Sequence, residues 1–173
     1  MSTNLGKSDV NIAYSLYGLG KAYYQLQKIT KSTEYLSRAK KLLDSSKHRA
    51  LGFENINLNV DILPLSAIVL YEKEQNLEEV LSFFNQIMKN MNKLSIEGLY
   101  YLIKLITILI NQNHVCDNSK KHNYHNTYIS TLDYIYNKIQ KTKKRIKSEE
   151  FQFSYLNNIP INKAIVEEWE KVK

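Results

Sequence analysis

The sequence predicts an all-α fold made of helical hairpins, and three observations support this. Gly and Pro number only five and two among 173 residues, which favours long helices and few turns. Apolar residues recur at spacings of three and four through most of the chain, as on amphipathic helices. Gly20 and Ala39 are small residues within apolar faces, where they allow two helices to approach closely. The length suits one domain or a short array of repeats, so residues 1–173 are expected to form a single domain.

The stretch Ala13–Asp44 is the clearest hairpin, with helices predicted over Ala13–Gln27 and Lys31–Asp44. Residues 1–10 are polar and are expected to form a short lead-in before the first helix. Residues 45–59 are expected to be either a loop or an extension of the second helix that ends near Gly52.

Further helices are predicted along the rest of the chain. The predicted segments are Val60–Glu74 with Pro64 near its start, Leu77–Asn92, a helix from Ser95 through the apolar run Leu99–Ile110, a polar loop Asn111–His125, Tyr128–Lys147, and Ile161–Val172 after Pro160. The apolar run Leu99–Ile110 is interrupted by Lys104 and Thr107, and no run reaches the ~18–20 residues of a membrane helix. The hairpins are therefore placed at 11–46, 60–93 and 95–147, with a closing segment at 151–173.

The order of small and large residues in the first hairpin resembles the tetratricopeptide (TPR) repeat family. The residues that carry the resemblance are Leu19, Gly20, Tyr23, Ser32, Leu36 and Ala39, and they return more weakly 48 residues later as Tyr71, Val80, Phe84 and Ile87. The segment Phe153–Trp169 is similar to the stretch that closes TPR arrays in bacterial signalling proteins. This resemblance implies an α-solenoid of about three hairpins with a C-terminal capping helix, or the C-terminal end of a larger array.

The same resemblance implies a non-catalytic scaffold, adaptor or regulatory module that binds a protein or peptide. In that family the first helix of each hairpin lines a concave groove. Carried onto this chain, the groove residues are Tyr14, Tyr17, Lys21 and Tyr24, then Ile62, Leu65, Val69, Glu72 and Lys73, then Tyr100, Ile103 and Thr107. Tyr side chains suit peptide capture because they offer a large contact area at a low entropy cost. The alternative is that these tyrosines pack against neighbouring helices.

A basic run, Lys138–Lys147, gives a second class of function. Its cationic residues are a candidate patch for an anionic partner: Lys138, Lys141, Lys143, Lys144, Arg145 and Lys147. Together with a formal net charge of +7, they keep nucleic-acid binding open as an alternative. The other interpretation is a solvated helix face whose cations pair with glutamates. The candidate partners are Glu149, Glu150 and the acidic cluster Glu72, Glu74, Glu78 and Glu79. A structural subunit of a larger complex is a third alternative.

Residues suited to chemistry do not form a recognised motif. His114, Cys116, His122 and His125 include metal-binding side chains, but their spacing matches no common zinc pattern, so no metal or cofactor is predicted. The sequence contains no phosphate-binding loop, nucleophile elbow or metalloprotease motif, which argues against an enzyme. The single Cys and the absence of a leader-like start predict a cytoplasmic protein. An exposed apolar face on the first helix would invite a partner or self-association.

Overall fold

The computed structural model describes residues 3–51, 56–112 and 118–173, with side chains for 10–51, 58–112 and 121–173. Every regular element in these ranges is a helix, which confirms the predicted all-α class. The elements are α1 (Thr3–Thr30), α2 (Thr33–Leu51), α3 (Ile56–Glu74), α4 (Leu77–Lys89), a short 3-10 helix η1 (Met91–Lys93), α5 (Ile96–Ile110), α6 (Asn118–Lys143), α7 (Glu149–Asn157) and α8 (Pro160–Val172). The chain forms two compact units, Met1–Gly98 and Leu99–Lys173, and each is described separately below.

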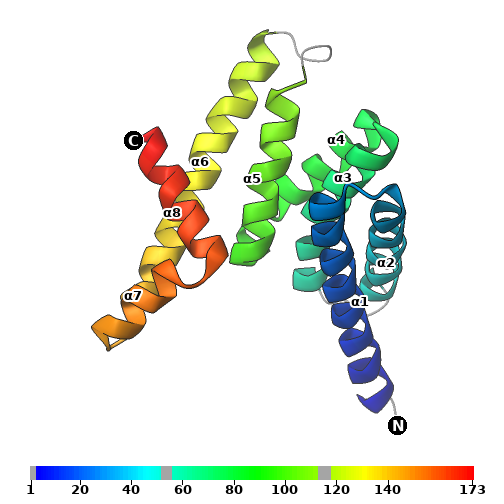
Figure 1. Cartoon of the computed structure of the whole chain (residues 1–173), viewed down its shortest axis with the longest axis horizontal. Helices are drawn as coiled ribbons and strands as arrows, with labels where there is room; N and C mark the ends of the chain where they lie inside the picture. Colours follow the sequence, from blue (N-terminus) through cyan, green and yellow to red (C-terminus); the bar gives the residue numbers. More distant parts are fainter. Residues whose placement is uncertain (1–2, 52–55, 113–117) are drawn as a thin grey trace. The chain divides into compact units, whose positions relative to one another are not determined.

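The first unit is built from two helical hairpins. Helices α1 and α2 run antiparallel and pack along each other, α2 also packs on α3, and α3 packs on α4 and η1 (Figure 1). The buried side chains recur at helical spacing on each element: Ala13, Tyr17 and Tyr24 on α1; Leu36, Ala39 and Leu43 on α2; Leu65, Ala67 and Val69 on α3; Val80, Phe84 and Ile87 on α4. Burial of these apolar faces supplies the main driving force for this unit.

Gly20 lies where α1 and α2 approach closely. A Cβ atom built on Gly20 would lie 2.9 Å from Leu43 Cγ and 3.5 Å from the Ala39 carbonyl oxygen. Leu43 is almost completely buried, so it has little room to move away. The prediction that Gly20 and Ala39 permit a close crossing is therefore confirmed.

The same turn closes both hairpins of the first unit. Lys31 after α1 and Gln75 after α3 adopt left-handed backbone conformations, with φ of 59° and 55°. Their backbone N–H groups donate to the carbonyl oxygens of Gln27 (2.7 Å) and Tyr71 (2.9 Å), which is the αL type of helix C-cap. These turns lie 44 residues apart, whereas the residue pattern returns after 48 residues, a difference of about one helical turn.

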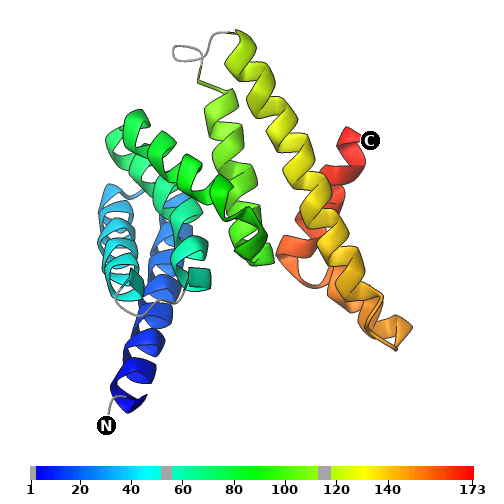
Figure 2. The same cartoon turned by 180° about the vertical axis from the view of Figure 1, so that it is seen from behind.

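The second unit contains α5 from Leu99 onward, α6, α7 and α8. Helix α8 packs on both α6 and α7, as seen from behind in Figure 2. The Trp169 ring on α8 stacks on Tyr136 of α6, with centroids 3.9 Å apart, and its Nε1–H donates to Asp133 Oδ1 at 2.6 Å. The buried Asn162 side chain donates to the Tyr155 carbonyl oxygen of α7 at 2.9 Å. These contacts hold α8 against the two helices that precede it.

Several element boundaries differ from the prediction. Helix α1 begins at Thr3, so part of the expected lead-in is helical. Helix α2 continues to Leu51, which selects the helical extension of the two alternatives for residues 45–59. The expected loop 111–125 is wrong in its second half, since α6 begins at Asn118. In α1 and α6 the additional residues are mostly polar and precede the apolar face of the helix, so periodicity gave no sign of these extra turns.

Two further differences concern Pro64 and α7. Pro64 lies inside α3 and not near its start, because α3 begins at Ile56. Helix α7 is an additional helix within the closing segment. Its N-cap is Ser148, whose hydroxyl accepts from the Phe151 N–H at 3.4 Å, and two glutamates follow in the first turn. Both features stabilise a helix start, so this start signal was present in the sequence.

Candidate functional site

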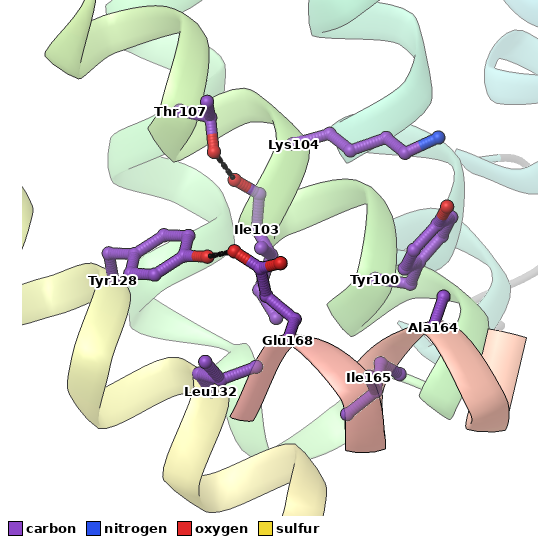
Figure 3. Close-up of a pocket in the computed structure, with 9 residues that line it drawn as sticks. All are labelled: Tyr100, Ile103, Lys104, Thr107, Tyr128, Leu132, Ala164, Ile165 and Glu168. Carbon is purple, nitrogen blue, oxygen red and sulfur yellow. Dashed lines mark hydrogen bonds between the residues drawn. The ribbon is translucent and has the colours of Figure 1, made fainter. Parts of the chain in front are cut away.

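The second unit contains a pocket of about 240 Å³ between α5, α6 and α8 (Figure 3). Each helix supplies part of the wall. The lining residues are Tyr100, Ile103, Lys104 and Thr107 from α5, Tyr128 and Leu132 from α6, and Ala164, Ile165 and Glu168 from α8. Residues 100, 103, 104 and 107 share one face of α5 because they are spaced by one helical turn.

Much of the pocket lining is apolar. Ile103, Leu132 and Ile165 are buried side chains that come from the three different helices. Ala164 lies beside Ile165 on α8, and its small side chain leaves space that a larger residue would fill. Such a surface favours binding of an apolar group, because each Å² of apolar surface removed from water on contact contributes about 25 cal/mol of binding free energy.

A hydrogen-bonded pair forms the polar part of one wall. The Tyr128 hydroxyl donates to Glu168 Oε1 at 2.5 Å, and the two side chains meet across the pocket wall in Figure 3. This bond lowers the pKa of the Glu168 carboxyl below its ordinary value. Burial, with the adjacent carboxylate, raises the pKa of the Tyr128 hydroxyl. Around neutral pH the pair is therefore a charged carboxylate held in place by a neutral phenol.

Lys104 supplies a cation on another part of the wall. Its Nζ lies 4.4 Å from the Tyr100 ring centroid and 5.9 Å from that of Tyr101. The side chain is half-buried, and no carboxylate in the described part of the chain forms an ion pair with it. The aromatic rings stabilise the ammonium group by cation–π interaction and leave its N–H donors able to bind a ligand.

Three residues of the groove predicted from the sequence lie in this pocket. Tyr100 and Ile103, with Thr107, were expected to line a groove on the third hairpin, and all three line the pocket. The prediction missed the other six lining residues, which are Lys104, Tyr128, Leu132, Ala164, Ile165 and Glu168. The sequence did contain a signal for Lys104. Lys104 and Thr107 are the residues that interrupt the apolar run of α5, and they lie on the same face of the helix as Tyr100.

The groove residues predicted on the first two hairpins lie in a different environment. Tyr17 and Tyr24 are only 6% and 3% exposed, and Ile62, Leu65 and Val69 are also buried. The structure thus favours the packing alternative for these tyrosines. A hollow beside Val69 measures only about 10 Å³ and holds at most one water.

The polar members of that predicted set bind one another. Lys21 Nζ lies 2.8 and 3.0 Å from the two Glu97 carboxylate oxygens. The Tyr24 hydroxyl donates to Glu72 at 2.9 Å, and Lys28 forms an ion pair with the same carboxylate. The Tyr17 hydroxyl donates to the Asp61 carbonyl oxygen at 3.2 Å. These side chains connect α1 to α3 and to Glu97, while Tyr14 and Lys73 are exposed.

The basic run lies at the end of α6 and in the segment that follows it. Its exposed members are Lys141, Lys144, Arg145 and Lys147, whereas Lys138 and Lys143 are half-buried. The glutamates considered as partners for the run bind elsewhere or are exposed. Glu72 and Glu74 form ion pairs with Lys28 and Lys40, respectively. The four exposed cations therefore form a solvated basic surface.

The histidine and cysteine group is only partly described. His114 and Cys116 lie outside the described residues, and His122 and His125 are exposed on α6. Within the described ranges no cluster of three or more His, Cys, Asp or Glu side chains is arranged to hold a metal ion. Among the same residues, no helix combines the length and apolar character needed to cross a membrane.

Comparison of the chain with protein-family models, with curated proteins and with solved structures finds no match.

Proposed function

We propose that this protein is a non-catalytic, peptide-binding helical module, and that the pocket between α5, α6 and α8 receives an apolar side chain of the bound peptide. The observation that carries the proposal is the pocket itself. It combines buried apolar residues from three helices with one cation, Lys104, and one carboxylate, Glu168. A peptide offers complementary groups, since it pairs apolar side chains with charged side chains and backbone N–H donors.

The size of the pocket favours a peptide anchor over a large cofactor. Sites for drug-sized ligands usually measure about 300–1,000 Å³, and this pocket is smaller at about 240 Å³. One or two apolar side chains fit such a volume. Binding energy in protein interfaces is often concentrated in a few anchors of this kind, with polar groups around them.

A TPR-like solenoid remains our proposal for the architecture. Two features support it: the hairpins α1–α2 and α3–α4 close with the same αL turn, and α8 packs on the preceding helices as a capping helix would. In this proposal the peptide contacts the third hairpin and its closing helix. The first two hairpins use their predicted groove tyrosines for internal packing.

The test is selection of peptides from a phage-displayed random library on the immobilised chain. Ala164→Phe fills the pocket, whereas Lys163→Phe adds the same side chain at an exposed neighbouring position that does not line it. We expect the unmodified chain and Lys163→Phe to enrich peptides with a shared large apolar residue. Ala164→Phe should bind these peptides at least ~10-fold more weakly, equivalent to about 1.4 kcal/mol.

The stability of Ala164→Phe must be checked by its thermal unfolding, so that loss of binding is not confused with loss of folding. If no peptide is enriched, or if enriched peptides bind Ala164→Phe as well as they bind the unmodified chain, the proposal is wrong.

A further inference from the structure

Helix α1 carries an apolar stripe that its own unit leaves exposed. The stripe consists of Ile12, Leu16, Leu19, Tyr23 and Leu26, which alternate at spacings of four and three. Ile12, Leu19 and Leu26 are 38%, 52% and 42% exposed, and the other two are half-buried. The adjacent face of the same helix, with Ala13, Tyr17 and Tyr24, is the one buried in the first unit.

The spacing of the stripe is that of a helix-pairing seam. Alternation of four and three residues keeps side chains in line with a partner helix, as in coiled coils. In the sequence Leu5 precedes Ile12 by the same seven residues that separate Ile12 from Leu19 and Leu19 from Leu26. The stripe from Ile12 to Leu26 extends about 21 Å along α1, at 1.5 Å per residue.

The charged residues around the stripe are few and already paired, so they do not favour a charged partner. Between Asn11 and Gln27 the only charged residue is Lys21, and its ammonium group binds Glu97 on another side of the helix. Arg38 of α2 lies near the stripe, over the Tyr23 ring, and pairs with Glu34. Because Arg38 is paired with Glu34 and Lys21 with Glu97, neither cation brings an unpaired charge to the seam between two copies of this face.

We infer that the stripe pairs with the same stripe of a second copy of the chain, with the two α1 helices antiparallel about a twofold axis. The antiparallel arrangement places the bulky Tyr23 near Leu16 of the other copy, and Ile12 near Leu26. A parallel pair would instead place Tyr23 against Tyr23. Twofold pairing of one patch with itself is also the commonest form of oligomer among soluble proteins.

The dimer should be weak and should respond to salt in a characteristic direction. A single helix pair of this length covers less than the ~800 Å² per partner of a standard interface. Each copy carries a formal charge of +7, so added salt should strengthen association by screening the repulsion between copies. An acidic helix bound to this basic chain would show the opposite dependence.

The first test is sedimentation equilibrium of the full chain up to about 1 mM, a concentration that matches a weak interface. We expect a monomer–dimer equilibrium whose dissociation constant rises at least ~10-fold in Leu19→Glu, because the variant places a charge in the seam. Gln25→Glu adds the same charge to an exposed part of α1 away from the stripe and should leave dimerisation within about twofold of the unmodified chain. Leu19 is half-exposed, so Leu19→Glu should retain the circular dichroism spectrum of the unmodified chain.

The second test fixes the direction of the helices. In a Cys116→Ser background, a mixture of Ile12→Cys and Leu26→Cys chains should be joined by a short bis-maleimide, whereas Ile12→Cys alone should not. A chain that stays monomeric to 1 mM, or a Leu19→Glu variant that dimerises normally, would overturn the inference. Efficient cross-linking of Ile12→Cys to itself would overturn the antiparallel arrangement.

Discussion

Gly18 and Gly20 are two residues apart on α1 and lie in opposite environments. A Cβ atom on Gly18 would have no neighbour within 4 Å, whereas one on Gly20 would press against Leu43. The sequence pattern identified the importance of Gly20 because it falls in the middle of an apolar face. Gly18 lies outside that face, so the two glycines provide a matched pair for testing the α1–α2 crossing.

We predict that Gly18→Ala stabilises the chain and Gly20→Ala destabilises it. Ala is better than Gly in a helix by up to about 1 kcal/mol, and Gly18→Ala should gain most of this. In Gly20→Ala the overpacking against Leu43 should exceed that gain and leave a net loss of about 1–2 kcal/mol. Urea unfolding followed by circular dichroism measures both variants. Equal stabilisation by the two substitutions would show that the helices are not in close contact at Gly20.

The Tyr128–Glu168 pair predicts a specific dependence of stability on pH. Because folding lowers the pKa of Glu168, its contribution is complete above the ordinary glutamate pKa, near 4.3, and is lost as the pH falls through the folded value. Glu168→Gln keeps an acceptor for the Tyr128 hydroxyl but cannot titrate. The stability advantage of the unmodified chain over Glu168→Gln should therefore shrink below about pH 4.3. An advantage that stays constant down to pH 2.5 would contradict this assignment.

Lys104 should determine the charge preferred beside the apolar anchor of a bound peptide. Peptides selected on the unmodified chain should carry an acidic residue near the anchor, because Lys104 has no ion-pair partner in the described structure. Selection on Lys104→Glu should enrich basic residues at that position instead. If both chains enrich the same peptides, Lys104 does not contact the ligand, even though the pocket binds.

At the scale of elements, periodicity predicted which faces are buried and was weaker at fixing register and helix ends. A shift of four residues keeps a side chain close to the same face of a helix, so the 48-residue and 44-residue offsets both fit the apolar pattern. The left-handed turns at Lys31 and Gln75 lie 44 residues apart, and neither residue is a Gly that would have signalled the turn. The helical start of α6 was missed because residues 118–125 are polar.

Docking of α8 depends on Trp169, the single Trp of the chain. Trp169→Ala removes both the ring stacked on Tyr136 and the bond to Asp133, and should cost about 2–3 kcal/mol, less than for a fully buried Trp. Trp169→Phe keeps an aromatic ring and should cost about half as much. Thermal unfolding followed by circular dichroism compares the two. No loss of stability in either variant would show that these contacts do not hold α8.

At the scale of the whole molecule, the sequence predicted the helical class. Three residues that it assigned to a groove, Tyr100, Ile103 and Thr107, line the pocket. The sequence could not predict that α8 brings Ala164, Ile165 and Glu168 to the same place, because a contact between distant helices leaves no local pattern. The tyrosines of α1 were assigned to a groove for a related reason. Spacing identifies a shared helix face but does not reveal which neighbour covers it, and here Tyr24 reaches Glu72 of α3.

The basic surface after α6 offers the main alternative to peptide binding, and one comparison separates the two. Capture from a lysate of the producing organism should be performed with and without nuclease. The four baits are the unmodified chain, Ala164→Phe, Lys163→Phe, and a variant with Lys141, Lys144, Arg145 and Lys147 all changed to Gln. We predict that a specific protein is retained by every bait except Ala164→Phe. Retention that is abolished by nuclease or by the four Gln substitutions, and is unchanged in Ala164→Phe, would contradict peptide binding in the pocket and favour a nucleic-acid partner.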